Sequence, residues 1–364
     1  MNEDNYKLTS AALICLLLCT RCFSALTFFP AQINSGTAYI IGAVTGTAIQ
    51  GLLIVPTVML AKKYRSDPCT LAFGQSENFG RGVTLAFLIY FIYEAFFDIG
   101  NLAYFTDYFF SVNMPRTAVV IGCVLTAVLA ALSSSAVIGR VSQPALFGIA
   151  VTLAVIAAGS AGEMDVTRFD LAVPHARETV LQAAFAETDR CECLVLFAFL
   201  AGRTKGDAAN TARRFLILKG LLICMICGMV TAVLGSFAMR TKLPVFTLAA
   251  ASENLITERS DAVFLPVWVF TGLVRLAILI YCAAACIRML IPKTKKMGST
   301  LAAGAVPAAM ALPLLTGYGW EKAVHSEHSL PAVIVLGTVL PMVMMRMCAQ
   351  SEEQRARVGA ANSG

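Results

Sequence analysis

The sequence predicts an all-α protein that crosses a membrane about ten times, and two observations support this fold class. Hydrophobic residues make up 58% of the 364 residues and charged residues only 14%, whereas a soluble domain carries roughly 25% charged residues. The mean hydropathy is +0.74, and the basic residues lie in short clusters between long apolar runs. This composition excludes an ordinary cytosolic enzyme, a disordered chain and a nucleic-acid binder, even though the net charge is +6.

Apolar stretches along the chain predict the individual spans, because a hydrocarbon core of about 30 Å needs about 20 residues of helix. The expected spans are residues 8–29, 39–60, 83–109, 118–132, 144–161, 180–200, 215–237, 262–290, 300–315 and 331–347. The third and the eighth exceed the required length, which indicates tilt or a turn outside the membrane.

The charges of the loops orient the bundle. With a cytoplasmic N-terminus, the even-numbered connections face the cytoplasm, where Lys and Arg collect in membrane proteins. These connections carry Lys62, Lys63, Arg65, Arg81, Arg140, Arg203, Lys205, Arg213, Arg214, Lys293, Lys295 and Lys296. We therefore expect both termini in the cytoplasm and the first apolar stretch retained as a span. Residues 1–350 are expected to form one transmembrane domain, and residues 351–364 a short, disordered tail.

Arg21 lies in the middle of the first span. A charge at this depth is costly and indicates either function or internal pairing. If the helix breaks here, the exposed backbone groups build a site for a small zwitterion, as in many transporters. Alternatively, Arg21 snorkels or pairs with Glu94 or Asp98 for structural reasons alone. The sequence leaves both interpretations open.

The third span carries Glu94 and Asp98, which are four residues apart and therefore share one helix face. Tyr93 lies near that face. Two carboxylates in this arrangement take a proton, a cation or an arginine, and the alternative is that they face a hydrated vestibule.

The sixth span is interrupted by four ionisable residues, Glu187, Asp189, Arg190 and Glu192. A continuous helix facing lipid does not tolerate them. Either the helix is broken and lines a cavity, or the span begins near Cys191 and the charges lie in an outer vestibule.

Two further basic residues lie within spans. Lys219 is one turn into the seventh span, so we expect it to snorkel to the inner interface. Arg275 is deeper in the eighth span, which predicts an internal carboxylate partner or a cavity. In the second span, Gly42 and Gly46 form a small-xxx-small motif that permits close approach of another helix.

Motifs for catalysis or cofactor binding are absent from the sequence. The two Cys-x-x-Cys pairs lie in apolar helix without a histidine nearby, and the three histidines lie in predicted outer loops. No nucleotide-binding fingerprint and no zinc-protease motif is present. We therefore expect no enzyme activity, no cofactor and no metal.

Several motifs occur in an order that resembles a known family. The clearest stretch is Glu253-Asn254-Leu255-Ile256-Thr257-Glu258-Arg259-Ser260-Asp261-Ala262-Val263-Phe264, followed by Trp268 and Arg275. The others are Gly139-Arg140-Val141, Glu192, the basic segment 203–214, and Gly235 followed by Leu243-Pro244. Together they resemble the endospore germination permease family, the B subunit of bacterial spore germinant receptors, in the amino acid–polyamine–organocation superfamily. The resemblance covers nearly the whole chain.

The resemblance implies a transporter-like bundle of two five-helix inverted repeats, with helices one and six broken around a nutrient pocket. It also implies a non-catalytic subunit that senses a nutrient such as an amino acid. Such a subunit lies in the inner spore membrane, beside an A subunit and a C lipoprotein.

The same resemblance leads to expectations for single residues. Ligand contacts are expected from Thr20, Ser24, Ala25, Tyr93, Phe185, Ala186 and Trp268. An intramembrane polar network is expected from Arg21, Glu94, Asp98, Glu192 and Arg275. Two other functions remain open: a secondary transporter that couples an amino acid to H⁺ or Na⁺ through Glu94 or Glu192, and a scaffold that holds partner subunits.

Overall fold

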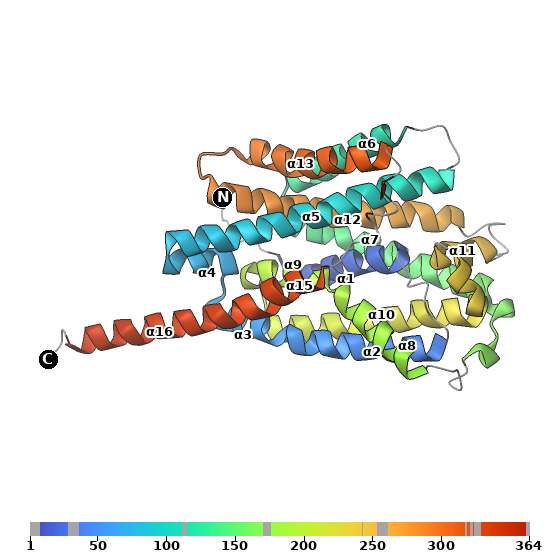
Figure 1. The fold of residues 1–364 in the computed structure, drawn as a ribbon, viewed down its shortest axis with the longest axis horizontal. Coiled ribbons are helices and arrows are strands. Elements are labelled where there is room, and N and C mark those ends of the chain that lie inside the picture. The colour runs from blue at the N-terminus through green and yellow to red at the C-terminus, as the bar shows by residue number, and fades with distance from the viewer. Residues whose placement is uncertain are drawn as a thin grey trace.

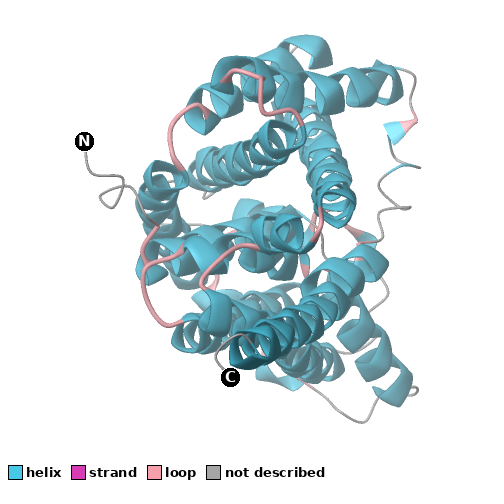
Figure 2. Cartoon of the chain, turned by 90° about the vertical axis from the view of Figure 1, so that its left-hand side faces the viewer, coloured by secondary structure: helices cyan, strands magenta, loops and turns pink. Residues whose placement is uncertain are grey.

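The computed structural model describes residues 8–27, 36–110, 115–169, 176–241, 243–252, 261–316, 319–320, 323 and 329–361. These residues form helices, turns and short connections, without a β-sheet. Most of the long helices run along the long axis of the molecule, and several are seen nearly end-on in the perpendicular view (Figures 1 and 2). The main helices are α1 (Ser10–Thr27), α2 (Gly36–Leu53), α3 (Val55–Tyr64), α4 (Pro68–Gln75), α5 (Glu77–Phe110), α6 (Arg116–Ala131), α7 (Ser135–Gly159), α8 (Ala176–Asp189), α9 (Glu192–Leu200), α10 (Ala208–Leu234), α11 (Pro244–Ala251), α12 (Asp261–Leu290), α13 (Lys296–Thr316), α15 (Leu330–Ile334) and α16 (Leu340–Ala361).

Eight helices of the described chain are long and apolar enough to cross a membrane. The second of these joins α2 and α3, and the last joins α15 and α16 through a π-helical turn. The other two predicted spans fall on shorter helices. Residues 118–132 lie on α6, which has 16 residues, and residues 180–200 are divided between α8 and α9.

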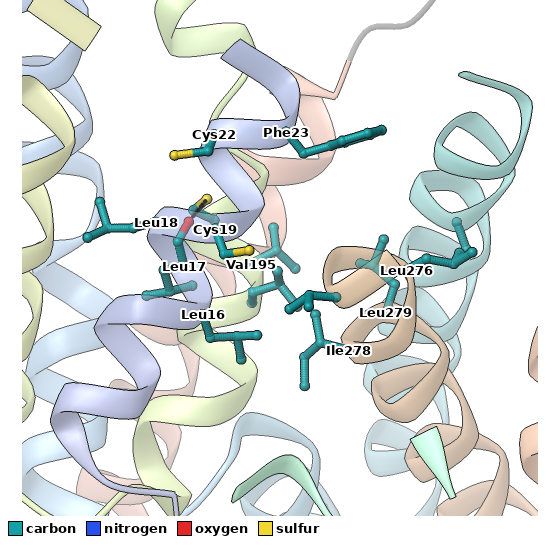
Figure 3. Packing of buried hydrophobic residues seen from close by; sticks show 14 of the residues in the cluster. Leu16, Leu17, Leu18, Cys19, Cys22, Phe23, Val195, Leu276, Ile278 and Leu279 are labelled. Atoms are coloured by element: carbon teal, nitrogen blue, oxygen red, sulfur yellow. Dashed lines mark hydrogen bonds between the residues drawn. The ribbon is translucent and has the colours of Figure 1, made fainter. Parts of the chain in front are cut away.

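Helix α1 lies in the interior of the bundle and packs on α7, α10 and α12. From Ala12 to Thr27 every side chain except Cys15 is buried. Figure 3 shows Leu16, Val195 and Ile278 between α1, α9 and α12, while Leu18 points to the other side of α1. A helix that is apolar on all sides is expected in such an interior position.

The expected break in the first span is wrong for the described part of that span. Helix α1 is continuous from Ser10 to Thr27, and this segment contains neither glycine nor proline. The hydroxyls of Thr20 and Thr27 donate to the carbonyls of Leu16 and Phe23, at 2.9 and 2.6 Å. Since both bonds reach back one turn, they satisfy the hydroxyls without interrupting the helix.

The sixth predicted span, in contrast, is interrupted. Helix α8 ends at Asp189 and α9 begins at Glu192, with Cys191 in a non-helical conformation between them. The interruption therefore coincides with the charged residues that the sequence places in this span.

Helices α2 and α8 make the most extensive helix–helix contact, through the small-xxx-small motif of α2. A Cβ on Gly42 would lie 2.6 Å from the carbonyl oxygen of Val180, and one on Gly46 would lie 2.7 Å from that of Ala184. Both obstacles are backbone atoms of α8. The absence of side chains at these two positions therefore sets the spacing of the two helices.

We predict that Gly46→Ala lowers the free energy of unfolding by about 1–3 kcal/mol, because the added methyl group overpacks the contact with α8. Gly51→Ala on the same helix is the matched control, since its Cβ would meet its nearest neighbour at an ordinary 3.6 Å. The measurement is thermal unfolding of the purified variants. Equal melting temperatures would contradict this account of the α2–α8 contact.

The C-terminal segment differs from the expected disordered tail. Helix α16 continues through Ala361 and extends beyond the ends of the neighbouring helices (Figure 1). Residues 351–357 are mostly Glu, Gln, Arg and Ala, which are strong helix formers. Their intrinsic propensity explains why the last span continues as a helix.

Candidate functional site

Two groups of charged side chains are buried around α1. The Arg275 cluster consists of Arg275 with Ser24, Glu94, Asp98 and Glu192. The Arg21 cluster consists of Arg21 with Gln50, Glu187 and Lys219. Every member of the two clusters is 5% exposed or less. Buried charges require partners, so the two clusters are the chemically distinctive part of the bundle.

In the Arg275 cluster one guanidinium connects four helices. Arg275 comes from α12, Glu94 and Asp98 from α5, Glu192 from the first turn of α9, and Ser24 from α1. Its Nε donates to Asp98 Oδ2 at 2.8 Å, and its Nη2 to Glu94 Oε2 at 2.8 Å. Its Nη1 donates at 2.6 Å to both Glu192 Oε1 and Ser24 Oγ. All three nitrogens therefore donate hydrogen bonds. A planar guanidinium is suited to bind several carboxylates at once in this way.

The surroundings of Arg275 fix its position. The Phe23 ring lies with its centroid 5.8 Å from the Arg275 Cζ atom, in a cation–π contact. Gly272, one turn earlier on α12, allows this approach, because a Cβ there would lie 2.6 Å from the Phe23 ring. Ser24 also donates a hydrogen bond to Glu192. Helix α1 is thus held against both α12 and α9 at this level.

In the Arg21 cluster one carboxylate faces two cations. Arg21 Nη2 donates to Glu187 Oε2, and Lys219 Nζ lies 2.7 Å from Glu187 Oε1. Gln50 completes the group: its amide donates to the backbone carbonyl of Glu187 at 2.5 Å, and its Oε1 accepts from Lys219. Arg21 Nε and Nη1 have no hydrogen-bond partner among the described residues.

The position of Lys219 corrects an expectation from the sequence. Lys219 does not snorkel to the inner interface, because its side chain is only 2% exposed and pairs with Glu187. The partner of Arg21 is also Glu187, not Glu94 or Asp98. Both differences have the same cause: α8 presents Glu187 to the interior of the bundle, opposite both cations.

The two clusters have opposite charge balances. The Arg275 cluster contains three carboxylates and one cation, and the Arg21 cluster contains one carboxylate and two cations. They meet along α1, where Arg21 and Ser24 are three residues apart, about 4.5 Å along the axis. Arg21 also interacts electrostatically with Glu192. The centre of the bundle is therefore polarised, with an excess of negative charge on one side and of positive charge on the other.

The expected ligand contacts on α1 and α12 are buried next to these clusters. Thr20 is one residue before Arg21, Ser24 belongs to the Arg275 cluster, and Ala25 follows it. Trp268 stacks on Phe23 at 5.4 Å between ring centroids, and its Nε1 donates to Thr27 Oγ1 at 2.9 Å. Trp268 therefore packs against the Thr27 end of α1.

The expected contacts on α5 and α8 are distributed differently. Tyr93 is half-buried and packs edge-on against Phe97, with ring centroids 4.9 Å apart, and Ala186 is also half-buried. Phe185 is 60% exposed, so the structure does not bring it together with the buried residues of the two clusters. Phe185 precedes the inward-facing Glu187 by two residues, which places it about 200° away around α8.

Gln50, Glu187 and Lys219 are the members of the clusters that sequence reasoning missed as site residues, although Glu187 and Lys219 were noted as charges within spans. The available signal for Gln50 was a polar amide within an otherwise apolar span. Within the described residues no group of three or more His, Cys, Asp or Glu side chains is placed to hold a metal ion.

Comparison with known proteins gives one finding. Among curated proteins no match is found. The family model described as spore germination protein matches residues 9–315, which include every member of both clusters. Residues 253–260, which carry part of the resemblance seen in the sequence, lie outside the described residues. Because the match covers most of the chain, the protein belongs to the spore germination protein family, whose members are multi-pass membrane proteins with receptor or transporter roles and no enzyme activity.

Proposed function

We propose that this protein is the nutrient-sensing subunit of a spore germinant receptor. It binds a small nutrient such as an amino acid near the middle of the membrane and signals germination to an A subunit and a C lipoprotein. In this proposal it forms one transmembrane domain over residues 1–350 in the inner spore membrane, with ten spans, two five-helix inverted repeats and both termini in the cytoplasm.

The polarised centre of the bundle is the observation that carries this proposal. A free amino acid has an ammonium and a carboxylate close together, and the adjoining clusters supply an excess of carboxylates and an excess of cations. In a low-dielectric interior this layout discriminates strongly between a zwitterion and a ligand of uniform charge. The interruption between α8 and α9 lies at the same level and gives the site an irregular wall.

Ligand binding acts on the partners by shifting a conformational equilibrium. Ser24 and Glu192 connect α1 to the α8–α9 interruption, and Arg275 connects both to α5 and α12. A ligand that contacts both clusters favours one relative placement of these four elements. The partner subunits respond to the more populated arrangement.

The test is a ligand screen on the purified full chain in lipid nanodiscs. Thermal unfolding is measured with the twenty common L-amino acids, a set of sugars and a set of nucleosides. A ligand that binds only the folded state raises the melting temperature. We expect one or a few amino acids to do so. If no nutrient raises it while the A and C subunits still assemble with the chain, the scaffold role replaces the sensing role.

The excess of carboxylates in the Arg275 cluster favours a second candidate function, a secondary transporter that couples an amino acid to H⁺ or Na⁺. Glu94 or Glu192 is then the ion-linked carboxylate. Uptake of a labelled amino acid into proteoliposomes along an ion gradient would favour the transporter, and binding without uptake favours the receptor.

A further inference from the structure

We infer that Arg21 binds the carboxylate group of the ligand, so that the site takes small molecules that carry a carboxylate. This inference rests on the proposed function, because it concerns the same site. It adds the chemical class of the ligand and the residue that selects it.

The first argument is the one-sided pairing of Arg21. A guanidinium has five N–H donors, and in Arg21 only Nη2 contacts an acceptor, Glu187. Nε and Nη1 are buried and make no hydrogen bond to a described residue. Arg275, in a comparable setting, uses all three nitrogens. Buried donors without acceptors are rare and costly in folded proteins, so the unused nitrogens of Arg21 indicate an acceptor that the described residues do not supply.

The second argument is the charge of that acceptor. Glu187 neutralises only one of the two cations in the Arg21 cluster, Arg21 and Lys219. A water molecule would satisfy the nitrogens but would leave the excess positive charge. A carboxylate satisfies both, and its hydrogen bonds to a guanidinium are about twice as strong as those between neutral groups.

The third argument is that α1 offers no alternative donor. Because α1 is continuous from Ser10 to Thr27, its backbone N–H groups at the level of Arg21 are bonded within the helix. The Thr20 hydroxyl donates to Leu16 O, and Lys219 already contacts Glu187 and Gln50. Arg21 therefore has the larger free capacity in this cluster, because its Nε and Nη1 carry three N–H donors without an acceptor among the described residues, whereas the Lys219 ammonium retains one. The excess carboxylates of the Arg275 cluster repel an anion and so place the carboxylate end of the ligand on the Arg21 side.

The experiment uses the full chain in nanodiscs and the amino acid that raises its melting temperature most. Its matched carboxamide keeps the side chain and the ammonium but has a neutral end group. We expect the carboxamide to bind the wild-type chain at least about tenfold more weakly than the amino acid, a difference of 1.4 kcal/mol. This comparison requires no variant. Equal affinities for the two probes would overturn the inference.

Substitutions then locate the effect. Arg21→Gln leaves Glu187 paired with Lys219, and we expect the preference for the amino acid over the carboxamide to disappear. Arg81→Gln is the control, since it also removes an arginine but from an exposed pair with Glu77 outside both clusters, and we expect the preference to persist in it. If Arg21→Gln does not fold, Arg21→Lys keeps a cation at this position and is expected to retain a reduced preference. An undiminished preference in the Arg21 variant that folds would overturn the inference.

The failure of this inference is distinguishable from failure of the proposed function. If a sugar or a nucleoside stabilises the chain and no carboxylate-bearing nutrient does, the protein is still a nutrient sensor but the role of Arg21 is overturned. If no nutrient binds at all, both are overturned.

Discussion

Replacing Arg275 with glutamine is expected to lower the free energy of unfolding by about 3–5 kcal/mol, the cost of removing one partner from a buried ion pair. The substitution leaves Glu94, Asp98 and Glu192 buried together without their shared cation. It also removes the connection between α12, α5, α9 and α1. The measurement is the amount of chain recovered from the membrane fraction together with its thermal unfolding.

A surface arginine provides the control. Arg81 pairs with Glu77 one turn earlier on α5, and its side chain is 59% exposed. An exposed pair of this kind contributes about 0–1 kcal/mol, so Arg81→Gln is expected to unfold nearly as the wild type does. Arg275→Lys keeps the charge but loses the planar guanidinium group with its several donors. Its free energy of unfolding should therefore lie between those of Arg275→Gln and Arg81→Gln. If Arg275→Gln and Arg81→Gln have equal effects, the Arg275 cluster does not hold the bundle together.

Replacing Glu187 with glutamine is expected to have a similar effect, about 3–5 kcal/mol, because Arg21 and Lys219 then face each other without a carboxylate. The double variant Glu187→Gln with Lys219→Met should recover part of that loss, since it removes one of the two uncompensated cations. Unfolding of the wild type, both single variants and the double variant gives the coupling energy. Additive effects would show that Glu187 and Lys219 are not coupled.

The position of the spans along the chain is the part of the fold that the pattern of apolar stretches predicts best. Eight of the ten expected spans fall on helices long and apolar enough to cross a membrane, and the other two fall on the shorter α6 and on α8 and α9. A bilayer demands long apolar stretches whatever their neighbours in the bundle are. A break within a membrane helix is harder to predict from the sequence. The break was expected in both the first and the sixth span, but residues 10–27 contain neither glycine nor proline and form one helix. In the sixth span the charged residues marked the interruption, because a continuous helix in lipid excludes them.

The sequence indicated most residues of the candidate site, but it did not indicate which of them pair with one another. Charged residues within spans are costly enough to stand out in any sequence. Which carboxylate meets which cation depends on the rotation of each helix about its axis. This is why the sequence suggested Glu94 or Asp98 for Arg21, whereas α8 presents Glu187. The same rotation exposes Phe185 and buries Lys219. These are properties of long-range packing, which a single sequence read by hydropathy does not contain.

The most direct test of a zwitterion site at the polarised centre is a structure of the full chain with the amino acid that stabilises it most. We predict ligand density between α1 and the α8–α9 interruption, with its carboxylate on Arg21 and its ammonium toward the carboxylates of the Arg275 cluster. Density at any other place, with the two clusters as they are in the free chain, would contradict the account.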